Sequence, residues 1–345
     1  KYLSDCGHQI AYCIPYKGVK FLEGYLETKD IRVTDQYYSY ARLPESRNFE
    51  DTFFAHAHSE FYVYQQFKPD ILIGDTGLLA CSYSPDIPFI KILTRFYLEL
   101  DNEYMLSPFT SVQRGTLRMN VENIINATRR KLGLPENFVY SQFIKPPVIL
   151  NGASYFLDDI KQQDYLYSGI NMALKGSSLI RNPDANMAFV SLGTGLAEHS
   201  SQILSKLLKL IETHFDKIYV CYGIRADLND LYQPKNAVFE RIYNQLPTNV
   251  GVLICHGGYA MLHLGIEICV PIIAIPLQLE QYSNSVKLET LGVGKNLATF
   301  NKDDFRGFYQ RTVINLDAVE DEITNIKEPV ILPKLIDRFK SKPDL

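Results

Sequence analysis

The sequence predicts an α/β protein with two domains, each built on a parallel β-sheet. Short apolar runs alternate with helical patterns along the chain, and this alternation gives parallel strands covered by helices on both faces. With 345 residues, the chain also exceeds what one compact core usually holds. A polar stretch between Tyr155 and Asp184 separates the halves, so we predict domains at 1–170 and 171–330. A weak helical pattern follows in 331–345, which we expect to form a helix that crosses back to the first domain.

The strand candidates are apolar runs bounded by turn residues. They are Gln9–Ile14, Pro69–Gly74, Phe89–Thr94, Asn186–Leu192, Lys217–Tyr222, Gly251–Cys255 and Pro271–Pro276. Helical patterns between them include Ser200–His214 and Tyr282–Leu291. The opening residues read as the end of a helix, with Gly7 after it and then the first strand candidate. Because an α/β domain rarely begins halfway through a helix, we expect its first strand to be missing from this sequence.

Composition and charge narrow the class of partner. The formal net charge is -4 with no long run of like charge, which argues against a nucleic acid or an anionic membrane as partner. The six cysteines form no C-x-x-C pair, which favours buried thiols in a reducing compartment. We find no stretch apolar enough to span a bilayer and no signal peptide, so the sequence predicts a cytoplasmic protein. It leaves the oligomeric state open.

The strongest local pattern is a strand, a glycine pair and a helix in direct succession. The buried strand Val250–Cys255 runs into His256, Gly257 and Gly258, and an apolar helix begins near Tyr259. Glycines allow close backbone approach to a phosphate, and the free N–H groups of a helix start favour negative charge. The pattern therefore predicts an anion site that includes His256, although a structural turn would show the same three residues.

A second pattern follows the next strand. Val270–Ile275 ends at Pro276, and Glu280 and Gln281 lie just beyond it. A carboxylate beside an amide at a strand's carboxyl end can hold sugar hydroxyls by paired hydrogen bonds. The alternative is the solvated first turn of a helix, where Glu is common for electrostatic reasons.

Together these patterns resemble the donor-binding signature of family-one glycosyltransferases, which include plant natural-product and bacterial macrolide enzymes. The spacing matches without a gap from His256 to Gly294. Its anchors are His256-Gly257-Gly258, Val270-Pro271, Pro276, Glu280-Gln281, Asn284 and Leu291-Gly292-Val293-Gly294. Weaker likeness covers Phe189–Thr194, Lys68–Asp75 and Gly7–Ile10. The resemblance implies the GT-B type of fold, with two Rossmann-like domains facing a cleft.

The resemblance also implies how a nucleotide-sugar donor would be held. His256 would meet the diphosphate together with Gly257, Gly258 and the helix start at Tyr259, and Gly193 and Thr194 would close over the phosphates. Glu280 and Gln281 would hold the sugar. The base would lie against Phe239 to Ile242, where the family usually has a Trp that this chain lacks. Phe239 either replaces that Trp by stacking or packs in the core.

The chain departs from the family pattern in the helix after Gly258. The family places a Glu that binds the ribose eight residues after the His, and this chain has Leu264 there. Glu267 lies one helical turn later on a similar face, so it either replaces that carboxylate or forms a salt bridge. The small polar residues that normally follow the glycines are also absent. Binding of a phosphate by this segment would therefore depend mainly on its backbone N–H groups.

The catalytic base is expected outside this sequence. The family's base is a His in the loop after the first strand, upstream of Lys1 here, and an Asp of the first domain orients it. Asp75 occupies the matching position, with capping of a helix near Thr76 as the alternative role. His56 and His58 alternate without an evident third ligand, so an acceptor-side or surface role is favoured over a metal site.

The resemblance thus implies a glycosyltransferase that uses a UDP- or dTDP-sugar and needs no metal or other cofactor. The acceptor would be a hydroxyl of a small or lipid-like molecule, bound by the first domain. Two alternatives stay open. One is a non-catalytic or partner-dependent homologue that binds a nucleotide sugar or a protein, and the other is a sugar-nucleotide hydrolase or epimerase of the same fold.

Overall fold

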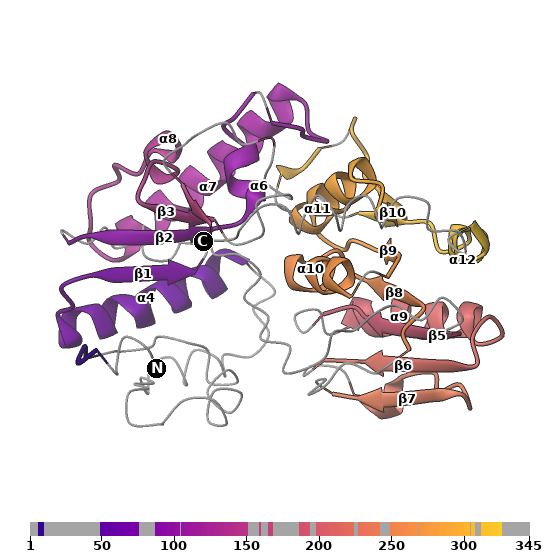
Figure 1. Cartoon of the computed structure of the whole chain (residues 1–345). Helices are drawn as coiled ribbons and strands as arrows, with labels where there is room; N and C mark the ends of the chain where they lie inside the picture. The colour runs from indigo at the N-terminus through magenta and orange to yellow at the C-terminus, as the bar shows by residue number, and fades with distance from the viewer. Residues whose placement is uncertain are drawn as a thin grey trace. The chain divides into compact units, whose positions relative to one another are not determined.

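The computed structural model of the chain divides into two compact units, whose elements are labelled in Figure 1. The first unit comprises Lys1–Asp101, Gly115–Leu150 and Gln163–Leu166, and the second comprises Asn102–Arg114, Asn151–Gln162 and Tyr167–Leu345. The residues that the structure describes are 6–9, 49–75, 87–103, 105–150, 159, 165–167, 186–193, 198–223, 227–241, 249–268, 270–303, 305–307 and 312–325. The predicted terminal helix in 331–345 lies outside them, as does most of the strand candidate Gln9–Ile14.

The first sheet has the strand order β1-β2-β3-β4. The pairings of β1 with β2 and of β2 with β3 are parallel, as the alternating pattern predicts. Two of the sequence candidates are confirmed as β1 and β2, with bounds that differ by at most three residues. The strands are β1 (Leu72–Asp75), β2 (Phe89–Leu93), β3 (Val148–Leu150) and β4 (Leu166–Tyr167).

Four described helices accompany this sheet, namely α4 (Phe49–Phe67), α6 (Arg95–Glu99), α7 (Ser111–Lys131) and α8 (Tyr140–Phe143). The longest, α7, begins at a reciprocal cap. The Gln113 N–H donates to Thr110 Oγ1 at 3.2 Å, and the Thr110 N–H donates to Gln113 Oε1 at 3.0 Å. The helix ends in three basic residues followed by Gly133, whose φ of 74° lets the chain turn away.

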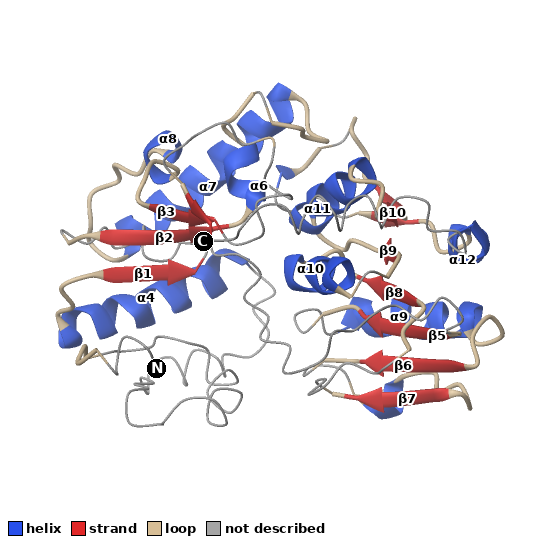
Figure 2. Cartoon of the chain, viewed as in Figure 1, coloured by secondary structure: helices blue, strands red, loops and turns tan. Residues whose placement is uncertain are grey.

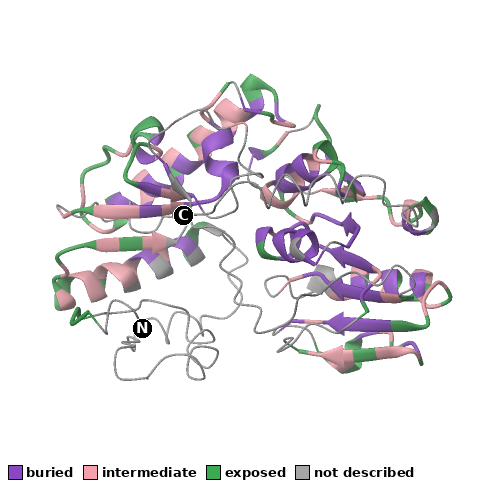
Figure 3. Cartoon of the chain, in the orientation of Figure 1, coloured by how far each residue is buried: buried purple, intermediate pink, exposed green. Residues whose placement is uncertain are grey.

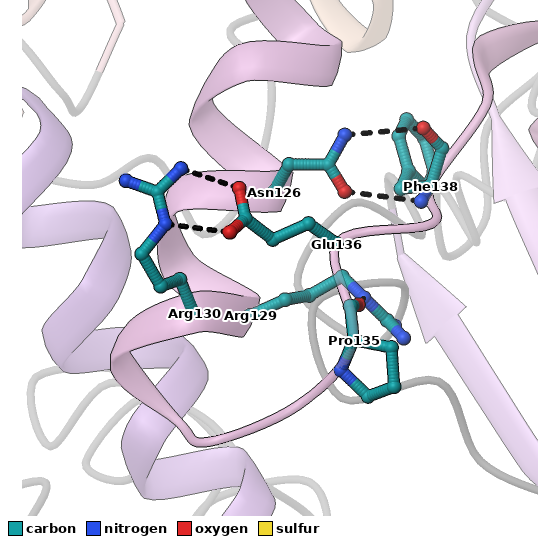
Figure 4. A network of polar contacts seen from close by, with 6 residues as sticks. All are labelled: Asn126, Arg129, Arg130, Pro135, Glu136 and Phe138. Atoms are coloured by element: carbon teal, nitrogen blue, oxygen red, sulfur yellow. Dashed lines mark hydrogen bonds and ion pairs between the residues drawn. The ribbon is translucent and has the colours of Figure 1, made fainter.

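The chain that leaves α7 is tied back to the helix by side chains (Figure 4). Asn126 donates to the Phe138 carbonyl at 3.2 Å and accepts from the Phe138 N–H at 3.0 Å. Arg129 is buried, and its guanidinium donates to the Pro135 carbonyl and to Asn137 Oδ1. These contacts fix the irregular segment between α7 and α8.

The second unit contains a sheet with the strand order β10-β9-β8-β5-β6-β7, and every neighbouring pair in it is parallel. Its strands are β5 (Met187–Ser191), β6 (Lys217–Cys221), β7 (Ala237–Glu240), β8 (Val252–Cys255), β9 (Ile272–Ala274) and β10 (Gly294–Asn296). The four second-half candidates are confirmed as β5, β6, β8 and β9. Two further strands, β11 (Ala298–Thr299) and β12 (Val313–Ile314), form a separate antiparallel sheet.

Apolar side chains cover both faces of this sheet. Phe189 of β5 belongs to a cluster with α10, while its neighbours Ala188 and Val190 belong to a second cluster with α9 and α12. This alternation explains why the strands read as unbroken apolar runs. Figure 2 shows the helices beside the strands, and Figure 3 shows that β8, β9 and α10 are almost entirely buried. The helical elements are α9 (Glu198–Ile211), η3 (Leu228–Asp230), α10 (Tyr259–Glu267), α11 (Leu279–Thr290) and α12 (Ala318–Asn325).

Within the described part of the chain, no helix combines the length and the apolar character needed to cross a membrane.

Candidate functional site

The strand order of the second sheet contains one switch point. From β5 the chain proceeds to β6 and β7 on one side, and from β8 to β9 and β10 on the other. In open parallel sheets, ligands bind beyond the carboxyl ends of the strands at such a point. Gly193 follows β5 and His256 follows β8, so two of the predicted residues lie at the switch point.

The His256 ring is held between two glycines. Its Nδ1 lies 3.4 Å from the Ser191 carbonyl oxygen, to which the His256 backbone N–H also donates at 3.3 Å. A Cβ on Gly193 would lie 2.8 Å from His256 Nε2, and a Cβ on Gly258 would overlap the same ring. Gly193 also has a φ of 86°. Both positions therefore need glycine for the imidazole to occupy this place.

The surroundings of His256 favour its neutral form. Burial lowers the pKa of the imidazole, and the hydrogen bond to the Ser191 carbonyl partly opposes this shift. Since a carbonyl only accepts, we assign the proton of the neutral ring to Nδ1, which leaves a lone pair on Nε2. A neutral ring of this kind cannot donate a hydrogen bond from Nε2. An anion that accepts a hydrogen bond from Nε2 would therefore bind only when the imidazole takes up a second proton there.

Gly257 lies in the turn after β8, where it packs closely against α11. It has a φ of 77°, and a Cβ there would overlap Ser285 Oγ and lie 2.8 Å from the Gln281 carbonyl oxygen. The buried Asn284 donates to the Gly257 carbonyl at 3.3 Å. Asn284, one of the anchors of the predicted signature, thus positions the glycine turn against α11.

The helix α10 begins directly after this turn. Gly258 is its N-cap residue, and no side chain caps it there. The N–H groups of its first turn are the donors on which an anion would depend. Tyr259 is buried, with its ring edge-on to His263 at 4.3 Å between centroids, so its side chain packs in the core. Leu264 is 0% exposed in the same apolar cluster, and this chain therefore uses the family's ribose position for packing.

The two predicted sugar-binding residues lie in the first turn of α11. Gln281 Oε1 accepts from the Leu277 N–H at 2.9 Å, which fixes the amide against the segment after β9. With its oxygen turned towards that N–H, the amide nitrogen is the group that can donate to a ligand. Glu280 lies beside it and is half-buried.

The remaining predicted residues are only partly described. Phe239 lies in β7 and packs against the apolar cluster of α9 and α12, which favours the core role of the two that the sequence left open. Asp75 ends β1 and Glu267 ends α10, but both side chains lie outside the described residues. Thr194 and Ile242 lie outside them entirely.

No group of three or more His, Cys, Asp or Glu that could hold a metal ion occurs among the residues that are described. His58 is half-buried, with its ring 5.8 Å from that of Phe54, and the side chain of His56 is not described. Sequence reasoning overlooked a Tyr222–Arg241 pair at the carboxyl ends of β6 and β7. The one signal for it was position, since Tyr222 ends a strand candidate and Arg241 lies between Phe239 and Ile242, where the resemblance places the base.

No family model matches the chain. A curated relative, the uncharacterized UDP-glucosyltransferase YdhE of Bacillus subtilis (strain 168), is 25% identical over 165 residues. This match covers 47% of the present chain and 40% of the relative, so the chain spans less than half of that protein's length.

Solved structures match over almost the whole chain. The glycotransferase of kitacinnamycin has a TM-score of 0.61 at 17% identity, covering 98% of this chain and 88% of the other. The calicheamicin glycosyltransferase CalG4 has a TM-score of 0.61 at 14% identity, covering 98% and 87%. SnogD from Streptomyces nogalater has a TM-score of 0.51 at 14% identity, again covering 98% and 87%.

These matches confirm the predicted fold class, because the chain has the parallel-sheet α/β architecture of GT-B glycosyltransferases. The resemblance to the family-one members of that class, predicted from the residues between His256 and Gly294, is confirmed as well.

Proposed function

We propose that the chain is a glycosyltransferase that moves a sugar from a nucleotide diphosphate sugar to an acceptor hydroxyl without a metal ion. One observation carries the proposal: the His256 ring is seated between Gly193 and Gly258 at the switch point, beside the uncapped start of α10. The likeness to a protein named as a UDP-glucosyltransferase favours UDP-glucose as the first donor to test.

The proposed domain roles follow the predicted boundaries. Residues 171–330 bind the donor, residues 1–170 bind a small or lipid-like acceptor, and residues 331–345 return to the first domain. His256, the N–H groups after Gly257 and the start of α10 hold the diphosphate. Glu280 and Gln281 hold the sugar, with Gln281 acting as a donor because its oxygen already accepts from Leu277. Gly193 and Thr194 close over the phosphates.

The proposed reaction is a direct displacement. The acceptor oxygen forms a bond to the anomeric carbon as the bond from that carbon to the phosphate oxygen breaks, and the nucleoside diphosphate leaves with the electron pair. A base takes the acceptor's proton, and Asp75 at the carboxyl end of β1 orients that base. His256 and the dipole of α10 stabilise the charge that develops on the diphosphate, in place of a cation.

The first experiment follows free UDP released by the full chain from UDP-glucose, with and without a mixture of phenolic and lipid alcohols. We expect release that depends on acceptor and is unchanged by EDTA. Release of equal rate without acceptor would instead indicate a hydrolase. His256→Ala should lower kcat/KM by roughly 10²- to 10³-fold, as for loss of one stabilising donor, with an unchanged melting temperature. Glu280→Ala should weaken UDP-glucose binding more than UDP binding.

A second candidate is a homologue that binds a nucleotide sugar, or a protein partner, without turnover. The burial of Leu264 favours it, because this chain has an apolar residue where the family has a ribose-binding carboxylate. A thermal shift with UDP-glucose but no release with any acceptor would support this candidate against the transferase.

A further inference from the structure

The second unit includes two stretches that the chain order places among elements of the first sheet. Leu106 belongs to Asn102–Arg114, which begins after α6, and Asp159 belongs to Asn151–Gln162, which lies between β3 and β4. These two excursions meet, because the Leu106 N–H donates to Asp159 Oδ2 at 3.0 Å. They are therefore joined to each other within the second unit.

The same carboxylate also pairs with a lysine in the last turn of α11. Asp159 Oδ1 lies 3.4 Å from Lys287 Nζ, and the Lys287 side chain is only 5% exposed. A buried ammonium group is costly unless an opposite charge accompanies it, so the pair restricts where this turn of α11 can lie. One carboxylate thus joins both excursions to one helix.

Aromatic packing holds the other end of the same helix. Phe109 of the first excursion is buried, and the centroid of its ring lies 5.6 Å from that of Phe300. Phe300 in turn lies edge-on to Tyr282, in the first turn of α11, at 5.1 Å between centroids. The first excursion therefore contacts α11 through these rings near its start and through Asp159 near its end.

The helix that is held in this way carries the proposed sugar-binding residues. Glu280 and Gln281 lie in its first turn, and Lys287 lies in its last. A helix of 12 residues moves as a rigid element, so a displacement of its last turn also shifts its first. The position of Lys287 therefore affects where the sugar-binding side chains lie.

We propose that Asp159 and Lys287 are positioning residues for the donor sugar, because their ion pair fixes the helix that carries the sugar-binding side chains. This inference rests on the proposed function and extends it to two residues that are not anchors of the predicted signature. The diphosphate depends less on the pair, since His256 and the start of α10 directly follow β8. Loss of the pair should therefore weaken the hold on the sugar more than the hold on the diphosphate.

The test separates positioning from stability. Isothermal titration of the full chain with UDP and with UDP-glucose gives two affinities, and their ratio measures the hold on the sugar. Lys287→Met removes the charge and keeps an unbranched apolar side chain, so the helix stays packed. We expect it to weaken UDP-glucose by about tenfold and UDP by about twofold, within the range for residues that act through others.

Asp159→Asn is the complementary variant. It keeps an oxygen that can accept from the Leu106 N–H, but it removes the negative charge beside the buried Lys287 ammonium. It should therefore lower the melting temperature as well as the relative affinity for UDP-glucose. The double variant Asp159→Asn/Lys287→Met removes the buried charge too, so it should recover the melting temperature while the relative affinity for UDP-glucose stays low.

The matched control is Asp101→Asn. Asp101 directly precedes the first excursion, and its Oδ1 accepts from Arg118 Nη1 of α7 at 2.7 Å, within the first unit. The substitution thus makes the same chemical change in an ion pair with α7 rather than with α11. The affinities for UDP and UDP-glucose should both stay at the wild-type level.

The other outcomes distinguish failure of the inference from failure of the proposed function. A Lys287→Met protein with the wild-type affinity ratio, or with equal losses for the two ligands, would overturn the inference and leave the proposed function standing. An effect confined to Asp159→Asn would do the same, because the cost of the buried Lys287 charge would explain it. An unaltered chain that binds neither UDP nor UDP-glucose would overturn both.

Discussion

Gly193 and Gly258 have the same neighbour, the ring of His256. A side chain at Gly193 would collide with Nε2 and would also have to adopt a φ of 86°, which is unfavourable for L-residues. The sequence shows both glycines but gives no sign that one imidazole requires them both. Their role follows from the position of His256 after β8, which the parallel pairing of β5 and β8 determines.

At the residue scale we therefore predict that Gly193→Ala abolishes most UDP binding. The substitution should also lower the free energy of unfolding by about 1–2 kcal/mol, through the positive φ alone. Titration with UDP and denaturant unfolding measure the two effects separately.

Gly133→Ala is the matched control for backbone strain. Gly133 has a φ of 74° after α7, and nothing lies within 4 Å of the Cβ that would be added. It should lose a similar amount of stability and keep full UDP affinity. A Gly193→Ala protein that binds UDP normally would show that the position of the His256 ring is unimportant.

At the scale of elements, α7 shows how an irregular segment is fixed. Asn126 makes two hydrogen bonds to the backbone of Phe138, whereas the Arg130–Glu136 ion pair nearby is exposed to solvent (Figure 4). The Glu136 carboxylate has a lowered pKa, first because of its hydrogen bond to Arg130. Solvent screens such a pair, while the loss of Asn126 leaves two backbone groups without their partner.

We predict that Asn126→Ala lowers the free energy of unfolding of the first unit by about 1–2 kcal/mol, the usual cost of losing such bonds. Glu136→Ala, in the same segment, should leave the melting temperature almost unchanged. Denaturant unfolding of the Asn126→Ala and Glu136→Ala proteins measures both losses of stability. A larger loss for Glu136→Ala would contradict the prediction that the Asn126 hydrogen bonds matter more than the ion pair.

At the scale of the whole molecule, buried histidines link stability to pH. Burial lowers the pKa of His263 in α10 from its ordinary value of 6.5 to about 4. Between these two values the unfolded chain binds a proton that the folded chain does not. Folding therefore loses stability as the pH falls from 6.5 towards 4, and this loss is absent above about pH 7.

We predict that His263 lowers the free energy of unfolding of the second unit by about 3 kcal/mol as the pH falls from 6.5 to 4. This value follows from the size of its pKa shift. His263→Leu should flatten the dependence of melting temperature on pH between 6.5 and 4. His214→Leu is the control, because His214 lies partly exposed beside Glu320, at 3.6 Å from its carboxylate. An equally steep dependence in His263→Leu would rule out His263 as its cause.

The predictable part of the fold follows from long apolar runs. β5, β6, β8 and β9 are buried on both faces, so their sequences read as continuous apolar stretches, and the candidates match them closely. β7 escaped notice because it has only four residues and none of them is fully buried. β3 has three residues and gives no periodicity to detect.

The sequence by itself determined the α/β class and the resemblance to family-one glycosyltransferases, which is densest in the segment from His256 to Gly294. These features are local, since apolar runs and glycine turns are contiguous in the chain. Only the tertiary structure decided which side chains share an environment. It packed Phe239 against the cluster of α9 and α12, engaged the Gln281 oxygen with Leu277, and brought Tyr222 and Arg241 together. The physical reason is strand order: parallel pairing joins residues nineteen positions apart at one edge of the sheet, and no local pattern encodes that pairing.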